Sequence, residues 1–202
     1  MDGLAPIWPQ SRIQCDGVSL GDAWPCSSML SGERIVCFHK LTQWMAYSLM
    51  VPMNKLAGIN WAGEYLLTGL PEYRNGGLLI DLGLLTLKEV QEKRGVGTYH
   101  QNSKKAGQPC VEVVPTFSPE DDVIVEWRAC TLGFLDMLLP EVNKALGLEG
   151  DKSLSLAQML EAGTWKVCVR EKPSIAPFNN TTQRADEKLP STLVQIQRHH
   201  LL

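Results

Sequence analysis

The sequence predicts a mostly α-helical domain over residues 1–172 and a tail without regular structure over residues 173–202. Two observations favour helices: apolar residues recur every three or four positions in several segments, and those segments end at glycine or proline. The third observation is a change of composition near Pro173, after which Ser, Thr, Asn, Gln and charged residues prevail. Such a segment lacks the apolar surface that a core needs, so we expect it to be disordered.

The overall composition is that of a globular protein. The 202 residues include 19 basic and 22 acidic side chains, a net charge of −3, and 44% hydrophobic residues. This balance excludes the basic footprint of a nucleic-acid-binding protein. The longest uncharged run, residues 41–54, is too short to cross a bilayer and contains Pro52, so no membrane association is expected.

The cysteines and the amino terminus predict an intracellular, cytoplasmic protein. The six cysteines are too sparse for a disulfide scaffold and include no C-x-x-C pair. Met1 is not followed by a basic and then an apolar stretch, so no secretory signal is expected. Cys37 and His39 could supply two metal ligands, but nothing nearby supplies the others, and no phosphate-binding glycine motif occurs. Neither a metal nor a cofactor is predicted.

The first helix is predicted over residues 34–50, after a turn-rich segment of Gly, Pro, Ser and Trp, and Pro52 is expected to end it. One side of this helix is expected to face the core because its residues recur at helical spacing. The members of this predicted core stripe are Phe38, Leu41, Trp44, Met45, Ser48 and Leu49. An adjoining face carries His39, Gln43 and Tyr47.

A second helix is predicted over residues 77–85, where four leucines form the apolar side and Asp81 points elsewhere. The turn-rich residues 68–77 precede it. Residues 88–118 show no clear period; we expect an exposed loop at 101–107 and a short strand at 111–114.

The clearest helix is predicted over residues 119–139. Ser118 is a suitable N-cap, Pro119 suits the first helical position, and acidic residues follow at the positive end of the helix dipole. Pro140 is expected either to kink this helix or to begin another at 141–146. Ser155 is expected to cap a last helix over 156–162 that Gly163 ends.

Polar residues on these otherwise apolar helices are the candidate functional groups. Most of them fall into two triplets, Glu72-Tyr73-Arg74 and Glu126-Trp127-Arg128, and His39, Lys40 and Gln43 on the first helix complete the set. One interpretation is structural, with ion pairs Glu72–Arg128 or Arg74–Glu126 joining helices. The other is a pocket lined by a carboxylate and an arginine, with a ring of Trp44, Tyr73 or Trp127 to stack on a base or sugar.

Several segments resemble the uracil catabolism protein 4 family, over residues 2–166 in all. The resemblance is carried by residues 38–49, by the long motif 67–83, and by residues 125–129 and 160–165, with support from 4–9 and 21–25. It implies a role in pyrimidine degradation, in a route that opens the uracil ring and releases urea. A weaker similarity links the chain to the queuosine salvage N-ribosyl hydrolases, whose helical fold is related to that of DNA glycosylases.

The second resemblance implies hydrolysis of an N-glycosidic bond in a ribosylated pyrimidine-breakdown intermediate, a small nucleoside or nucleotide. A buried carboxylate would stabilise the oxocarbenium-like state or activate water. The candidates in order are Glu72, Asp81 and Glu126. Arg74 and Arg128 would hold the ligand. The remaining pocket residues would be His39, Gln43, Trp44 and Tyr73.

The resemblance also implies that the chain is a truncated, C-terminal portion of a longer domain, incomplete at both ends. Family members are about twice as long, and residues 166–170 and the polar tail depart from their pattern. A portion of this kind would expose apolar helix faces that the remainder covers. The alternative function is therefore a non-catalytic fragment or interaction module with an incomplete site, and a third possibility is a plain nucleotide-binding protein.

Overall fold

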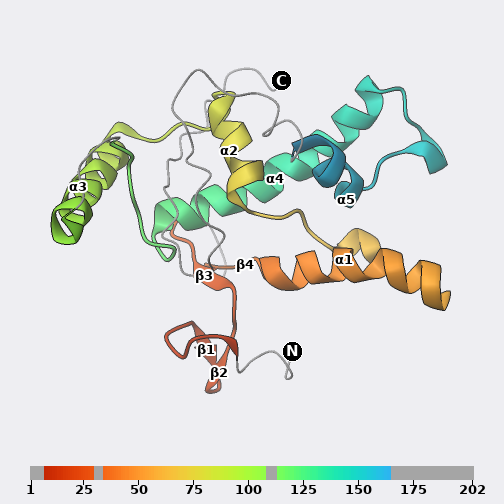
Figure 1. The fold of residues 1–202 in the computed structure, drawn as a ribbon, viewed down its shortest axis with the longest axis horizontal. Coiled ribbons are helices and arrows are strands. Elements are labelled where there is room, and N and C mark those ends of the chain that lie inside the picture. Colours follow the sequence, from red (N-terminus) through yellow and green to blue (C-terminus); the bar gives the residue numbers. More distant parts are fainter. Residues whose placement is uncertain (1–6, 30–33, 108–112, 165–202) are drawn as a thin grey trace.

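The computed structural model describes residues 7–29, 34–107 and 113–164, and within them the protein is mostly α-helical, as predicted (Figure 1). Two small antiparallel pairs of strands precede the helices. β1 (Gln14–Cys15) and β2 (Val18–Ser19) form a hairpin. Asp16 and Gly17 both have positive φ, as its two-residue turn requires. β3 (Ala23–Pro25) pairs with β4 (Ile35–Cys37), Trp24 lying opposite Val36.

The helical elements follow in chain order and are joined by loops. They are α1 (Lys40–Ala57), the 3₁₀ turn η2 (Glu64–Leu66), α2 (Tyr73–Asp81), α3 (Glu89–Ala106), α4 (Asp122–Ala145), the 3₁₀ turn η3 (Gly150–Lys152), α5 (Leu156–Met159) and the π-helical turn η4 (Leu160–Thr164). None of them, within the described ranges, has both the length and the apolarity to cross a bilayer.

Helix α4 is the centre of the fold, with α2, α5 and β3 packed on it (Figure 1). Residues of α4 enter all three core clusters of the described chain. Trp127 packs with Leu79 and Phe117, Val125 packs with Trp24 and Phe38, and Leu135 packs with Leu70 and Met159. Since each cluster joins α4 to a different neighbour, this helix fixes the positions of α2 and β3 relative to one another.

The predicted orientation of the first helix is wrong. α1 begins at Lys40, continues through Pro52 and ends at Gly58, a left-handed C-cap with φ 64°. Of the predicted core stripe, Phe38 is buried but lies before the helix. Leu41, Trp44, Met45, Ser48 and Leu49 are exposed.

The other side of α1 faces the body instead. Tyr47 packs against the Leu70–Leu135 cluster and its hydroxyl donates to the Thr68 carbonyl at 2.9 Å. The Gln43 Oε1 accepts a hydrogen bond from the Thr68 N–H at 3.3 Å. Polar contacts with one loop thus determine which face of α1 turns inward. The spacing of apolar residues cannot predict these contacts.

Helix α3 occupies a region where the sequence predicted mixed structure and an exposed loop. It contains few apolar residues, but Glu89 and Glu92 lie in its first turn and Lys104 and Lys105 in its last, which complements the helix dipole. Gly95 lies against Pro115 and Phe117. Val113 and Val114 form no strand, and residues 111–112 lie outside the described residues.

The boundaries of the later helices also differ from prediction. α2 begins at Tyr73 and ends at Asp81, earlier than expected. α4 is capped by Asp121, whose side chain accepts from the Val123 N–H, rather than by Ser118, and it continues through Pro140. The predicted cap at Ser155 is confirmed as a capping box with Gln158. The predicted tail, 173–202, lies outside the described residues.

Candidate functional site

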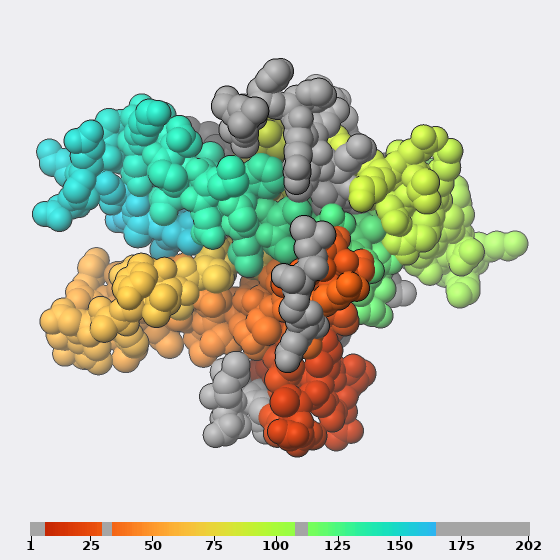
Figure 2. Space-filling view, turned by 180° about the vertical axis from the view of Figure 1, so that it is seen from behind, coloured from red at the N-terminus to blue at the C-terminus, as the bar shows by residue number. Residues whose placement is uncertain are grey.

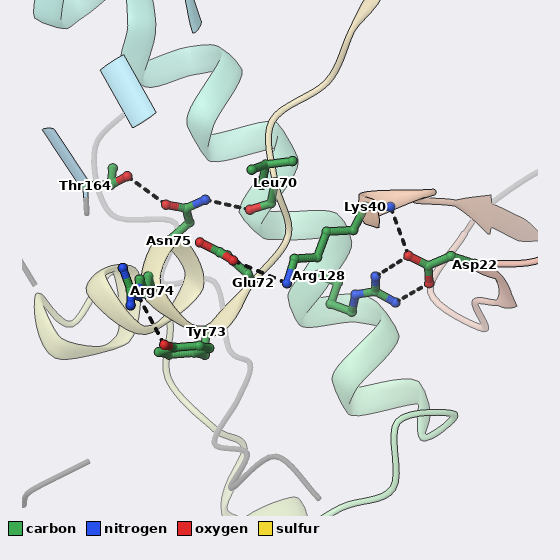
Figure 3. A network of polar contacts seen from close by, with 9 residues as sticks. All are labelled: Asp22, Lys40, Leu70, Glu72, Tyr73, Arg74, Asn75, Arg128 and Thr164. Atoms are coloured by element: carbon green, nitrogen blue, oxygen red, sulfur yellow. Dashed lines mark hydrogen bonds and ion pairs between the residues drawn. The ribbon is translucent and has the colours of Figure 1, made fainter. Parts of the chain in front are cut away.

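A bidentate ion pair between Asp22 and Arg128 joins the strands to α4. The Arg128 Nη1 donates to Asp22 Oδ1 at 2.8 Å, and Nη2 donates to Oδ2 at 2.7 Å (Figure 3). The Trp24 indole N–H donates to Oδ1 at 2.6 Å, and the Lys40 main-chain N–H donates to Oδ2 at 3.1 Å. The guanidinium lies over the Phe38 ring, 4.1 Å from its centroid. Both carboxylate oxygens are therefore fully engaged.

The environment of Asp22 favours its ionised form. Burial by itself would raise its pKa, but the hydrogen bonds and positive charge of Arg128, with the donors from Trp24 and Lys40, outweigh burial. The pKa of Asp22 is therefore lowered from its ordinary value. Asp22 is thus a charged carboxylate whose two oxygens are both hydrogen-bonded, and it holds the start of α1 through the Lys40 main-chain N–H.

Glu72 lies next to this ion pair, at the N-cap position of α2. Its Oε2 is 3.2 Å from the Lys40 ammonium, and its side chain is only 13% exposed. Its Oε1 is buried and accepts no hydrogen bond from any residue that the structure describes. Lys40 thus binds Asp22 through its main chain and Glu72 through its side chain, and it brings the two carboxylates into one neighbourhood (Figure 3).

A pocket of about 230 Å³ opens beside this pair. Lys40, Leu41, Trp44 and Glu72 line it. The Trp44 side chain is 47% exposed, so one of its surfaces is available for stacking. The pocket therefore combines an ammonium, a carboxylate with a free acceptor and an aromatic ring.

Buried contacts fix α2 and hence Glu72. The Asn75 amide nitrogen donates to the Leu70 carbonyl at 2.6 Å, and its oxygen accepts from the Thr164 hydroxyl at 2.7 Å (Figure 3). A Cβ on Gly76 would lie 2.5 Å from the Trp127 ring, so only glycine permits this approach of α2 to α4. These contacts hold α2 against the Leu70 carbonyl, η4 and α4, and they thereby fix the position of Glu72.

The other predicted carboxylates lie apart from Glu72. Asp81 is exposed at the opposite end of α2, roughly 14 Å along the helix axis at 1.5 Å per residue. Partial burial raises its pKa from the ordinary value. Glu126 is half-buried on α4, two residues from Arg128 and therefore on a different side of the helix. Neither residue lines the pocket.

The predicted binding residues are distributed around the pocket and beyond it. Trp44 lines the pocket, and Gln43 supports the Thr68 loop. His39 is the left-handed N-cap of α1, with φ 45°. Tyr73 is exposed, and its hydroxyl accepts a hydrogen bond from Arg74 Nε at 3.1 Å. Tyr73 and Arg74 lie on the side of Glu72 away from Lys40 in Figure 3.

The predicted ion pair between Glu72 and Arg128 is wrong, because each residue has another partner. Those partners are Lys40 and Asp22. The sequence placed Lys40 among the polar candidates without predicting a role for it, and it did not single out Asp22 as a site residue. The signal for Asp22 was a carboxylate in an otherwise apolar stretch that also contains Ala23 and Trp24. Within the described ranges, no group of three or more His, Cys, Asp or Glu side chains is arranged to hold a metal ion.

Comparisons with known proteins agree with one another. A family model described as "Protein of unknown function (DUF1688)" matches residues 1–174. "Uracil catabolism protein 4" of Lachancea kluyveri is 47% identical over 174 residues, and "Protein urg3" of Schizosaccharomyces pombe is 44% identical over 177 residues. The matches cover 82% and 86% of this chain but 38% of each relative. No solved structure matches. The chain is a member of the DUF1688 family and corresponds to less than half the length of these two relatives.

Proposed function

We propose that this protein acts in pyrimidine breakdown by binding a pyrimidine-derived nucleoside or nucleotide in the Glu72–Lys40 pocket and hydrolysing its N-glycosidic bond. The name of the Lachancea kluyveri relative, which refers to uracil catabolism, supports the metabolic role. The site supports the ligand class, because a half-exposed Trp44 ring beside two charged groups suits a planar base that carries polar edges.

The single observation that carries the proposal is the unequal use of the two Glu72 oxygens. Lys40 holds Oε2, whereas Oε1 is buried without a partner among the described residues. An unsatisfied buried acceptor costs about 1–3 kcal/mol, and a ligand hydroxyl or N–H would satisfy it. The carboxylate is therefore ready to accept a hydrogen bond from a bound molecule or from an attacking water.

The chemistry proposed for Glu72 needs only water as co-reactant. The bond between the sugar carbon C1′ and the base nitrogen breaks, and positive charge develops on the sugar. The Glu72 carboxylate stabilises that charge or accepts a proton from water as its oxygen bonds to C1′. The departing nitrogen takes up the proton that the water molecule gave up, so Glu72 returns to its carboxylate form and one water molecule yields the free sugar or sugar phosphate and the free base. Arg128 and Asp22 act as positioning residues, because they anchor the start of α1 and thereby Lys40.

The test is to substitute Glu72→Gln in the full chain and measure release of ribose from uridine and of ribose 5-phosphate from uridine monophosphate. Loss of a general base or charge-stabilising group lowers turnover by about 10²-fold or more. Glu120→Gln, at an exposed position before α4, is the matched control and is expected to turn over normally. Equal turnover by the Glu72→Gln and native chains contradicts the proposal.

A non-catalytic role is the second candidate, and the pairing within the site favours it. Glu72 and Lys40 neutralise each other, and both Nη groups of Arg128 are engaged by Asp22. In that case calorimetry with uridine would detect binding that Glu72→Gln weakens, but no sugar would be released. Absence of both binding and turnover would instead favour an interaction module.

A further inference from the structure

Helix α1 turns a continuous apolar face to solvent. We propose that this face is a docking surface for the polypeptide that corresponds to the part of the longer relatives that this chain does not match. The α1 apolar face consists of Leu41, Trp44, Met45, Leu49, Val51 and Leu56.

The arrangement of the α1 apolar face is that of a buried helix surface. Each member lies three, four or seven residues from another member, and together they span about half of the helix circumference, at 3.6 residues per turn. Yet Leu41 is 53% exposed, Val51 57% and Leu56 88%. Of the 18 residues of α1, all of them described, only Met50 is buried. Contiguous apolar surface of this kind marks an interaction site.

The protein body contacts the opposite side of α1, so the apolar face is not available to it. Tyr47 and Gln43, which hold the Thr68 loop, lie on that opposite side. In Figure 2, α1 and η2, in orange and yellow, project from the body on the side opposite α3. The apolar face therefore needs a partner from outside the described residues.

The comparisons identify the occupant. This chain covers 38% of each of two relatives that are 47% and 44% identical to it, so more than half of each relative has no counterpart here. At this level of identity we expect the matched parts to share a fold, and the proposal places the same helix face in the interior of the longer relatives. The charged residues of α1 are Lys40 and Lys55. At 3.6 residues per turn, Lys55 lies between Trp44 and Leu41 within the arc of the α1 apolar face. The occupant therefore presents a mainly apolar surface with a polar group opposite Lys55.

Docking on this face would also close the pocket. Leu41 and Trp44 belong both to the α1 apolar face and to the pocket wall. A polypeptide that covers them would exclude water from the space beside Glu72. This last consequence rests on the proposed function, whereas the docking itself does not depend on any ligand.

The first experiment compares this chain with a chimera in which it replaces the matched segment of the Lachancea kluyveri relative. Hydroxyl-radical footprinting reports the solvent accessibility of side chains in both proteins. We expect labelling of the α1 apolar face to fall severalfold in the chimera. Val90, 76% exposed on α3, is the internal reference for a surface outside the interface. Equal labelling of α1 in the two proteins overturns the proposal.

The second experiment introduces charge into the face with the double substitution Leu49→Glu and Leu56→Glu. Because both side chains are exposed in this chain, its melting temperature is expected to stay unchanged. The same double substitution is expected to lower the melting temperature of the chimera by several degrees. Val90→Glu and Met137→Glu, which replace exposed apolar residues on α3 and α4, are the matched controls.

Other occupants give distinguishable results, and each of them overturns the proposal. A second copy of this chain would make α1 labelling fall as protein concentration rises, and the double substitution would prevent it. Coverage by residues 165–202 of the same chain would give low labelling in the isolated chain at every concentration. A chimera that does not fold would show that the relative does not accept this chain. None of these readouts depends on turnover, so failure of the proposed hydrolysis leaves them intact.

Discussion

Asp22 and Arg128 lie 106 positions apart in the sequence and bind each other through two parallel hydrogen bonds. The side chains are 10% and 13% exposed, so the pair is nearly sequestered from water. Removing one partner of a buried pair leaves the other charged and unpaired, which typically costs about 3–5 kcal/mol. The contribution of this pair to stability can therefore be measured by breaking it from one side.

The substitution Asp22→Asn is expected to lower the free energy of unfolding by about 3 kcal/mol, because Arg128 keeps its charge and loses its counter-ion. Urea denaturation followed by circular dichroism measures the change. Asp151→Asn, at an exposed position in η3, is the control and is expected to have little effect. A loss at Asp22 no larger than at Asp151 would show that the pair contributes nothing to stability.

Acid is expected to destabilise the protein through the same carboxyl group. The pKa of Asp22 is lower in the folded state than in the unfolded state, where an aspartate has a pKa of about 3.9. Its contribution to stability is therefore present above pH 4 or so and is lost as the pH falls through the lowered folded value. The slope of unfolding free energy against pH in this range should diminish in Asp22→Asn. An identical slope in the variant would assign the acid sensitivity to other groups.

Gly76→Ala is expected to destabilise the protein by about 1–3 kcal/mol, because the new Cβ would overlap the buried Trp127 ring. The neighbouring Gly77→Ala is a matched control in the same helix. Nothing lies within 4 Å of a Cβ at Gly77, and replacing a helical glycine by alanine gains roughly 0.5–1 kcal/mol. Thermal unfolding of the two variants should therefore shift in opposite directions. A shift in the same direction would contradict the close approach of α2 to α4.

Alkaline titration is expected to ionise Tyr47 above the usual pH range of a tyrosine hydroxyl. Burial, with the negative charges of Glu64 and Asp136, raises the pKa of Tyr47 to about 12. A raised folded pKa stabilises the protein fully below the unfolded value of about 10, and this contribution is lost as the pH rises towards 12. The ultraviolet absorbance of tyrosinate should lose its component near pH 12 in Tyr47→Phe. A titration curve of unchanged shape in that variant would contradict the assignment.

Local sequence chemistry predicted the elements that local interactions decide. The Ser155 capping box and the mostly helical content follow from residues within one turn of each other. The direction in which α1 faces depends on the Thr68 loop, 21 and 25 residues from its partners on the helix, and no periodicity reports that contact. The spacing of apolar residues identified the apolar face of α1 correctly but predicted that it faces the core, whereas the structure leaves it exposed to solvent.

In the candidate site, too, the sequence predicted what local chemistry decides and did not predict what long-range contacts decide. Glu72 was predicted as the leading carboxylate, and it borders the pocket. Its partner Lys40 and the neighbouring Asp22 could not be chosen from the sequence, because they are brought there by long-range packing. The sequence contains many possible pairs of opposite charge, and Asp22–Arg128 is selected only once β3 lies on α4. Pairing across such separations is a property of the tertiary structure.

The position of Asn75 has a consequence for the chemical ageing of the protein. Asparagine followed by glycine is the sequence in which a side-chain amide is lost most readily, through ring closure onto the next main-chain nitrogen. Here that nitrogen, of Gly76, donates to the Glu72 carbonyl at 2.8 Å, while the Asn75 side chain is engaged by Leu70 and Thr164. An intact α2 thus shields a vulnerable amide. Deamidation would replace the Asn75 amide with a carboxylate that faces the Leu70 carbonyl. A molecule in which α2 unfolds locally would therefore accumulate irreversible damage beside Glu72.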